Sequence, residues 1–234
     1  MVVPSARPGG RARFLRETYV RPENLRSRAG AWLAAIRPYT RRSFRASFQG
    51  PRPCLLLIDL QRFFLEPEAP GYLPAAEAVV PRLEELRTAF RDRGLPVFLT
   101  RHTDPPGDAC SLMADWWGRP MDPEDPWCDP AAPFRPQEGE VLLEKHRYSA
   151  FRGTGLAARL REEGVSAVVV AGVMTHLCCE STARDAFQYG FPVVFPADGS
   201  ADLDETLHLG SLRGLAHGFA VPVLVEEVVW ALGK

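Results

Sequence analysis

The chain has 234 residues, 46 % of them hydrophobic and 24 % charged, and its formal net charge is −1. These values are typical of a soluble globular protein with a sizeable core. No apolar run approaches the roughly 20 residues that a membrane-spanning helix needs. We therefore expect no membrane-spanning segment and no membrane partner. The arginine-rich amino terminus lacks the apolar core of a secretory signal; an organellar transit peptide is the alternative interpretation. Five cysteines, two of them adjacent, argue against a disulfide framework and favour the cytoplasm.

The charge is unevenly distributed along the chain. Residues 1–50 contain 11 arginines against Glu17 and Glu23, a balance of +9, so the remainder carries −10. Such a segment can bind nucleic acid, but this one also holds aromatic and aliphatic residues: Trp32, Leu33, Ile36, Tyr39, Phe44 and Phe48. We therefore predict no nucleic-acid partner, and an arm over residues 1–50 that lies across the acidic body of its own or a neighbouring subunit. Residues 51–234 form the remaining domain.

From residue 54 onward, apolar strand patterns alternate with helical patterns. Strands are predicted at residues 54–60, 95–100, 140–145, 166–172, 192–198 and 221–226. Helices are predicted at residues 75–94, 154–164, 179–190 and 204–218. A long loop, residues 102–136, carries one helical turn around 111–118, and loops of that length are usually functional. The alternation predicts a Rossmann-like three-layer α/β/α sandwich with a six-stranded, mostly parallel sheet.

Reactive side chains follow three of these strands. Asp59 ends the first strand, Lys145 ends the third and Cys178 follows the fourth. Ligand sites of such sheets lie beyond the carboxyl ends of the strands, so we expect these groups to meet there. A helix start and a nearby ammonium would lower the pKa of the Cys178 thiol, and Asp59 could move its proton. The alternatives are a buried structural cysteine and an aspartate that only caps the next segment.

Lysine is rare in this chain. Only Lys145 and Lys234 are lysines among 28 basic residues, so position 145 is expected to need a compact ammonium group. Chance is the alternative explanation.

The other candidate groups point to packing rather than to a metal or cofactor. Cys179 lies about 100° further round the helix, which predicts core packing; a vicinal disulfide is the alternative. His176 is expected in polar packing or an interface, with a role as base as the alternative. No metal is expected, because Cys110, Cys128, His102 and His146 are too scattered for a ligand cluster and the sequence has no Asp-x-His or His-x-His pair. The glycines at residues 153–155 do not make a dinucleotide fingerprint.

Three stretches together resemble the isochorismatase-like hydrolases, a superfamily of cysteine hydrolases that includes nicotinamidases and N-carbamoylsarcosine amidohydrolases. They are LLLIDLQRFF (55–64), LEKHRYSAF (143–151) and GVMTHLCCESTARDAFQYGFPVVFPAD (172–198). The resemblance covers residues 50–226 and implies a six-stranded parallel sheet between helices. It also implies catalytic Asp59, Lys145 and Cys178, a cis peptide bond between Val173 and Met174, and an oxyanion hole formed by the amides of Met174 and Cys178.

The resemblance implies attack of the Cys178 thiolate on an amide or related carbonyl, giving a thioester. Asp59 would protonate the departing amine and then activate water, and Lys145 would hold both groups. The alternative is the vinyl ether hydrolysis of true isochorismatases, which HRYSAF, ADWWG and the amino-terminal extension resemble. Those enzymes typically have glycine at the position of Cys178 and tyrosine at that of Met174. Because this chain differs from them at both positions, we favour C–N hydrolysis.

Two further alternatives come from other functional classes: a catalytically retired binding module and a redox sensor that uses Cys178 and Cys179. Nicotinamide is disfavoured as a substrate, because LTRHTDPPGD lacks the metal-binding Asp-x-His that nicotinamidases usually carry after the second strand. For the pocket of a small-molecule substrate we expect Phe63 and Trp117, with Gln61 and His102 as further candidates. Packing against a neighbouring subunit is the alternative for Trp117. Family members are commonly oligomers, which implies a homodimer or homotetramer.

Overall fold

The computed structural model describes residues 16–105, 107 and 112–233. Its centre is a parallel sheet in the order β3-β2-β1-β4-β5-β7, with the short β6 paired to β4 off this path. The strands are β1 (Pro53–Ile58), β2 (Val97–His102), β3 (Val141–Lys145), β4 (Ala167–Val173), β5 (Val193–Pro196), β6 (Ser200–Ala201) and β7 (Val221–Val223). The predicted α/β fold class is confirmed.

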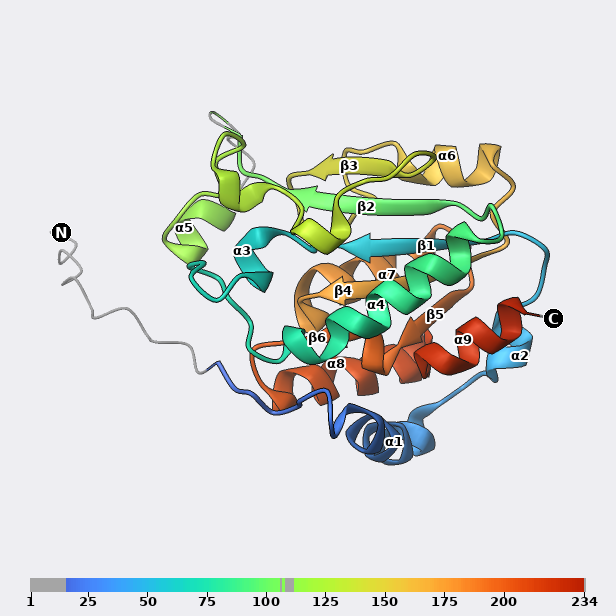
Figure 1. Cartoon of the computed structure of the whole chain (residues 1–234). Coiled ribbons are helices and arrows are strands. Elements are labelled where there is room, and N and C mark those ends of the chain that lie inside the picture. The colour runs from blue at the N-terminus through green and yellow to red at the C-terminus, as the bar shows by residue number, and fades with distance from the viewer. Residues whose placement is uncertain (1–15, 106, 108–111, 234) are drawn as a thin grey trace, which may run out of the picture.

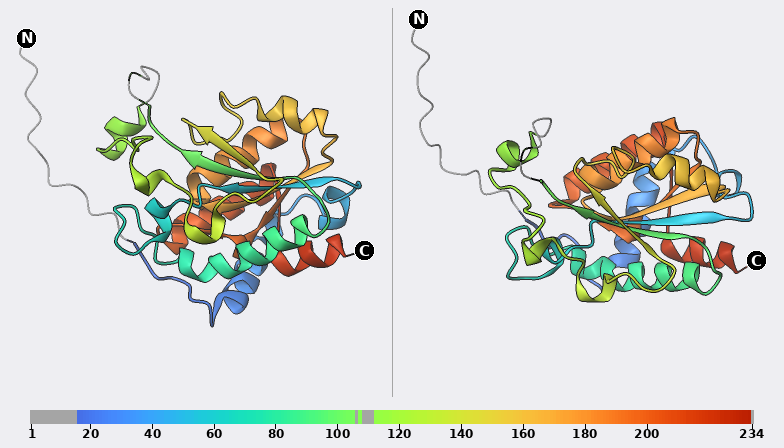
Figure 2. Two further views of the ribbon diagram at one scale, coloured as in Figure 1. Left: turned by 45° about the horizontal axis from the view of Figure 1, so that its top comes forward. Right: turned by 90° about the horizontal axis from the view of Figure 1, so that it is seen from above.

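Helices cover both faces of the sheet. They are α1 (Leu25–Ile36), α2 (Phe44–Ser47), α3 (Arg62–Leu65), α4 (Ala76–Arg91), α5 (Met113–Trp117), α6 (Leu156–Glu162), α7 (Glu180–Gln188), α8 (Glu205–Gly218) and α9 (Val225–Leu232). Helices α4 and α9 lie on one face, and α6 and α7 lie on the other (Figure 2). Within the described part of the chain, no helix combines the length and apolarity needed to cross a bilayer.

The central strands are apolar on both faces because both faces are covered. β1 and β4 are buried along their whole length and pair in register, with Leu55 opposite Val169 and Ile58 opposite Gly172. All strands point the same way, so their carboxyl ends share one edge of the sheet. Figure 1 shows α3 and α5 gathered beyond the arrowheads of β1 to β3 at that edge.

Three predicted strands extend beyond their observed carboxyl ends, whereas the strands predicted at 95–100 and 166–172 stop short of theirs, at His102 and Val173. The strand predicted at 54–60 ends at Ile58, because Asp59 turns the backbone with a φ of 50°. The strand predicted at 221–226 ends at Val223, because the Glu227 carboxylate accepts a hydrogen bond from the Leu224 N–H at 2.8 Å and starts α9. The strand predicted at 192–198 ends at Pro196, where a short 3-10 turn, η5 (Ala197–Gly199), follows.

The described part of the predicted arm, residues 16–50, lies on the body of its own chain. The apolar side of α1 and Val20 before it are at most 3 % exposed; these residues are Val20, Leu25, Ala29, Trp32 and Ile36. Charged contacts accompany this packing, since Arg28 pairs with Glu205 and Arg26 Nη2 lies 3.1 Å from Glu226 Oε1. We call residues 16–50 the amino-terminal segment.

Gly172 allows β4 to approach β1 at the end that carries the site. Its φ is 125°, and a Cβ at this position would lie 2.2 Å from the Ile58 carbonyl oxygen. The next peptide bond but one along the chain, between Val173 and Met174, is cis.

We predict that Gly172→Ala destabilises the protein by roughly 2–6 kcal/mol, the sum of a strained φ and an overpacked contact. Gly210→Ala is the matched control. Gly210 lies in α8, and a Cβ at this position would have no neighbour within 4 Å. This variant should stabilise the folded protein by up to about 1 kcal/mol. Urea unfolding followed by circular dichroism measures both, and equal stabilities of the two variants would contradict the prediction.

Candidate active site

The side chains of Asp59, Lys145 and Cys178 meet at the carboxyl edge of the sheet. Lys145 Nζ lies 2.8 Å from Asp59 Oδ2 and 3.4 Å from Cys178 Sγ. The Asp59 and Lys145 side chains are fully buried, and Cys178 is 8 % exposed. The ends of β1 and β3 and the turn after β4 therefore bring a carboxylate, an ammonium and a thiol together, as the sequence predicted.

Asp59 is held from both sides of its carboxylate. Its backbone N–H donates to Thr100 Oγ1 at 2.9 Å, and the Thr100 hydroxyl donates to Asp59 Oδ1 at 2.6 Å. The other oxygen, Oδ2, faces the Lys145 ammonium. The φ of 50° is uncommon for a residue with a side chain, and such outliers concentrate at functional sites. This backbone turn aims the carboxylate across the end of β2 toward β3.

Lys145 is the last residue of β3, and its ammonium has a partner for each hydrogen. Besides Asp59 and Cys178, Nζ donates to the Arg147 carbonyl oxygen at 3.0 Å. Burial acts to lower the pKa of Lys145, but the Asp59 carboxylate and the Cys178 sulfur outweigh it, and the pKa lies above its usual value. Lys145 is therefore a cation at neutral pH, buried and directed at two acidic groups.

Cys178 lies in the turn between β4 and α7. This turn, Thr175–Cys179, is a π-helical segment (η4), and we call it the Cys178 turn. Burial and the Asp59 carboxylate raise the pKa of the Cys178 thiol, against a smaller lowering by Lys145. The predicted net lowering of the thiol pKa is therefore wrong for the resting site. The sulfur carries its proton at neutral pH, next to a carboxylate that can accept it.

Of the predicted substrate residues, Trp117 belongs to the long loop, in α5, and Phe63 lies in α3. The half-buried Phe63 ring leaves no room for a side chain at residue 71, and the Arg119 guanidinium lies 5.9 Å from its centroid. Trp117 Nε1 donates to the Tyr148 hydroxyl at 3.0 Å. Both rings therefore connect the loop after β2 to other parts of the same chain.

The two further candidates differ in what their polar atoms do. His102 Nδ1 lies 3.5 Å from Lys145 Nζ, so His102 borders the cluster. Gln61 is fully buried, and its amide donates to the carbonyl oxygens of His102, at 3.0 Å, and Cys128, at 2.8 Å. Its oxygen accepts from the His102 N–H at 2.9 Å. These bonds use both amide hydrogens, which favours a role in holding the loop to β2 over the predicted contact with substrate.

Three residues near the cluster did not stand out in the sequence: Thr100, Asp104 and Tyr148. Asp104 Oδ1 lies 3.4 Å from His102 Nε2, and its other oxygen accepts from the Met121 N–H. Burial raises the pKa of Asp104, but these two hydrogen bonds outweigh it and the pKa is lowered. Thr100 and Asp104 lie at or just beyond the carboxyl end of β2. The argument that selected Asp59, that ligand sites lie beyond the carboxyl ends of parallel strands, would also have selected them.

The described residues after β2 do not provide the donor set expected for a metal. Nicotinamidase-like metal binding would need an Asp-x-His after β2, whereas the chain has His102 and Asp104 in the reverse order, paired with each other. Among residues 16–105, 107 and 112–233, no group of three or more His, Cys, Asp or Glu side chains is placed to hold a metal ion. Cys110 lies outside the described residues.

The neighbours of Cys178 in sequence have separate roles. Cys179 is fully buried in the core, as its predicted packing role requires. His176 Nδ1 lies 2.7 Å from Asp202 Oδ1, and the His176 N–H donates to Asp202 Oδ2 at 2.8 Å. His176 is thus held in polar packing.

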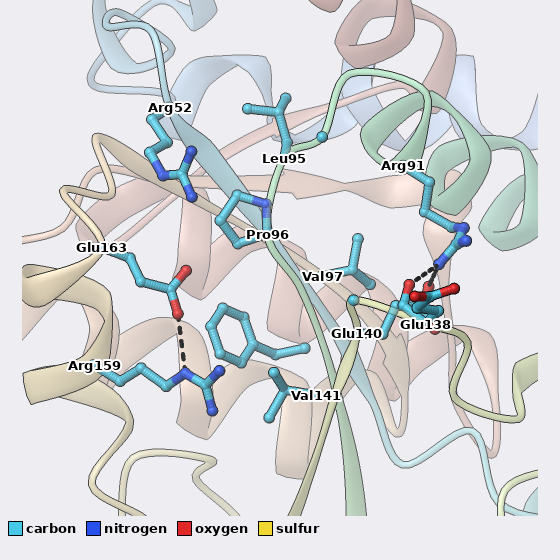
Figure 3. A pocket seen from close by; sticks show the side chains of 13 residues that line it. Arg52, Arg91, Leu95, Pro96, Val97, Glu138, Glu140, Val141, Arg159 and Glu163 are labelled. Atoms are coloured by element: carbon cyan, nitrogen blue, oxygen red, sulfur yellow. Dashed lines mark hydrogen bonds and ion pairs between the residues drawn. The ribbon is translucent and has the colours of Figure 1, made fainter.

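A depression of about 910 Å³ opens beside the cluster, where the loop after β3 faces α7. Its lining includes Lys145, Tyr148 and three arginines, Arg147, Arg152 and Arg184. A second, smaller depression of about 250 Å³ lies at the opposite, amino-terminal edge of the sheet (Figure 3). There Arg159 pairs with Glu163 at 3.0 Å and Arg91 with Glu140 at 3.2 Å. Of the three reactive residues, Lys145 lines the first depression, and none lines the second.

Comparison with known proteins gives concordant matches. The family model described as "Isochorismatase domain" matches residues 53–227. Nicotinamidase 3 of Arabidopsis thaliana is 35 % identical over 179 residues, which are 74 % of this chain and 85 % of that protein. N-carbamoylsarcosine amidase of Arthrobacter sp is 29 % identical over 180 residues, 74 % of this chain and 68 % of that protein. The crystal structure of a cysteine hydrolase from Pseudomonas syringae pv. phaseolicola superposes with a TM-score of 0.75 at 25 % identity, over 84 % of this chain and 97 % of that one.

The raised thiol pKa makes a testable prediction. The rate of Cys178 alkylation by iodoacetamide should keep rising beyond pH 9, because the thiolate forms only there. Asp59→Asn should move this pH profile to lower pH, since the carboxylate raises the thiol pKa, and Lys145→Met should move it to higher pH. Peptide mass spectrometry measures the rates, with the buried Cys54 as internal reference. A plateau near pH 7 in the unmodified protein, or an upward shift in Asp59→Asn, would contradict the assignment.

Proposed function

Because the chain belongs to the isochorismatase family of hydrolases, we propose that it cleaves a C–N bond, of amide or carbamoyl type, in a small molecule through a thioester on Cys178. The observation that carries the proposal is the contact of one buried ammonium with both a carboxylate, at 2.8 Å, and a thiol, at 3.4 Å. The relatives named nicotinamidase and N-carbamoylsarcosine amidase are amidases by name, which supports C–N chemistry.

In the first step, the Cys178 sulfur attacks the substrate carbonyl carbon while Asp59 accepts the thiol proton. A C–S bond forms, and the carbonyl oxygen becomes an oxyanion. The raised thiol pKa means that this proton leaves as the sulfur attacks rather than before. The Lys145 ammonium keeps its proton and stabilises first the carboxylate and then the sulfur as negative charge moves between them.

In the second step, Asp59 gives the proton to the departing nitrogen, the C–N bond breaks and a thioester remains. Water then attacks the thioester, and Asp59 accepts a proton from it. The C–S bond breaks, the sulfur recovers its proton, and the carboxylic acid leaves. Asp59 thus acts alternately as base and acid, so one carboxylate fixed by Thr100 is sufficient for both half-reactions.

The oxyanion needs hydrogen-bond donors beside the sulfur. We assign this role to the backbone N–H groups of Met174, which directly precedes the Cys178 turn, and of Cys178 near its end. Donors fixed in a low-dielectric site stabilise the developing charge without reorganising during the reaction. Removing one such donor typically slows an enzyme by about 10²–10³-fold.

The substrate is assigned as a small molecule that enters the depression beside Lys145. Trp117 contacts Tyr148 of its lining and His102 contacts Lys145, which supports their predicted roles. Phe63 is kept as a candidate, although it is not among the lining residues. Nicotinamide is disfavoured, because the chain lacks the Asp-x-His expected of nicotinamidases. No cofactor is assigned. We further propose a cytoplasmic homodimer or homotetramer.

A second candidate is vinyl ether hydrolysis, in which Asp59 would protonate the substrate and Cys178 would take no part. The motif around Lys145 favours it, since HRYSAF resembles true isochorismatases. Cysteine at position 178 and methionine at 174 favour the C–N hydrolase, because those enzymes typically have glycine and tyrosine there.

The proposal predicts that Cys178→Ala lowers turnover of amides and carbamoyl compounds by about 10⁴-fold or more, as loss of a nucleophile does. Cys179→Ala is the matched control, and it should retain activity within about tenfold because this thiol only packs in the core. Assays use a panel of small amides and isochorismate, and intact-mass measurement during turnover should find an acyl adduct on the unmodified protein.

Undiminished isochorismate cleavage by Cys178→Ala, with no amide turned over, would establish the vinyl ether route instead. A protein that binds compounds from the panel and turns over none of them would establish the retired binding module. Oxidation that removes two hydrogens from Cys178 and Cys179 under mild conditions would establish the redox sensor.

A further inference from the structure

The Cys178 turn is held by side chains from one neighbouring segment, residues 200–211. Asp202 is fully buried and accepts hydrogen bonds from the His176 N–H and ring. Thr175 Oγ1 lies 2.9 Å from His208 Nδ1 and donates to Ser200 Oγ at 3.1 Å. The first two residues of the turn are therefore fixed by groups outside it.

The amino-terminal segment packs directly behind those groups. The Tyr19 hydroxyl accepts a hydrogen bond from the Asp202 N–H at 3.1 Å, and the Glu17 N–H donates to the Leu203 carbonyl oxygen at 2.8 Å. Trp32 stacks edge-on against His208, with ring centroids 4.5 Å apart, and its Nε1 donates to Glu205 Oε1 at 2.6 Å. Figure 1 shows α1 beside α8.

Two short routes thus connect this segment to the turn. One runs from Tyr19 through Asp202 to His176, and the other runs from Trp32 through His208 to Thr175. Burial lowers the pKa of His208 to about 4. The ring is therefore uncharged at physiological pH and exerts no net charge on its neighbours. The contacts are hydrogen bonds and ring packing, which set positions rather than charge.

We propose that Tyr19 and Trp32 are positioning residues for the Cys178 turn, and that the amino-terminal segment is a built-in support of the reactive site. The segment precedes the region that the family model matches, residues 53–227. The effect on turnover rests on the proposed function, whereas the effect on the turn itself does not.

The test uses Tyr19→Phe in the full chain, which removes one hydroxyl and keeps the ring. We expect faster amide hydrogen exchange in the peptide that contains residues 174–179, with the rest of the sheet unchanged. With the best amide of the panel as probe, kcat should fall about three- to tenfold, the worth of one hydrogen bond, at unchanged KM. Arg26→Gln is the matched control, because it removes an exposed ion pair of the same segment far from the turn, and it should change neither readout.

A double-mutant cycle tests the route through Asp202. If Tyr19 acts through that residue, the effects of Tyr19→Phe and Asp202→Asn on exchange at 174–179 will be non-additive. Trp32→Phe, which removes the indole N–H and keeps an aromatic ring, examines the second route in the same way and replaces Tyr19→Phe should that variant not fold.

Unchanged exchange at 174–179 in Tyr19→Phe and Trp32→Phe would overturn the proposal. Uniformly faster exchange over the whole chain would also overturn it, because it would indicate a loss of global stability only. Should no amide be turned over, the exchange measurements and the rate of Cys178 alkylation by iodoacetamide still decide the inference. Failure of the proposed function is thus distinguishable from failure of the support.

Discussion

The buried ion pair between Lys145 and Asp59 is the interaction on which the rest of the site depends. Neither side chain has exposed surface, and an unpaired charge at such a place costs several kcal/mol. The Thr100 hydroxyl, the Arg147 carbonyl and the Cys178 sulfur complete the hydrogen bonding of the two groups. Because each charge is tolerable only beside the other, the ends of β1 and β3 are fixed relative to one another, and the sulfur is fixed to both.

The parallel sheet makes this meeting of charges achievable. β2 pairs with β1 on one side and with β3 on the other, and His102 stands opposite Lys145 in that register. The Asp59 side chain therefore has to cross the end of β2 to contact Lys145. The left-handed backbone conformation at Asp59 directs it there, and the Thr100 hydroxyl accepts a hydrogen bond from the Asp59 N–H and holds that conformation. Gln61 adds to the same end, because its buried amide holds the long loop against the last residue of β2.

Much of this arrangement could be predicted from the sequence, because strand ends and reactive residue types are local signals. The meeting of Lys145 and Asp59 follows from strands that end in charged residues at one edge of the sheet. The direction of the Cys178 thiol pKa did not follow, since it depends on how burial and two opposite charges balance in space. Neither did the support by Tyr19 and Trp32, because an arginine-rich segment does not indicate where its few aromatic residues will pack.

Strand ends and turns differ in how firmly they hold a reactive group, and this site uses both. Asp59 and Lys145 are fixed by the sheet, but Cys178 is carried by a π-helical turn whose position depends on outside contacts. A sulfur that keeps its proton until it attacks has to remain within reach of both the carboxylate and the ammonium, since the proton moves only over a hydrogen-bond distance. The contacts behind the turn are therefore a means of adjusting reactivity while the three reactive residues stay the same. An amino-terminal segment that contacts this turn can change the rate without changing the chemistry.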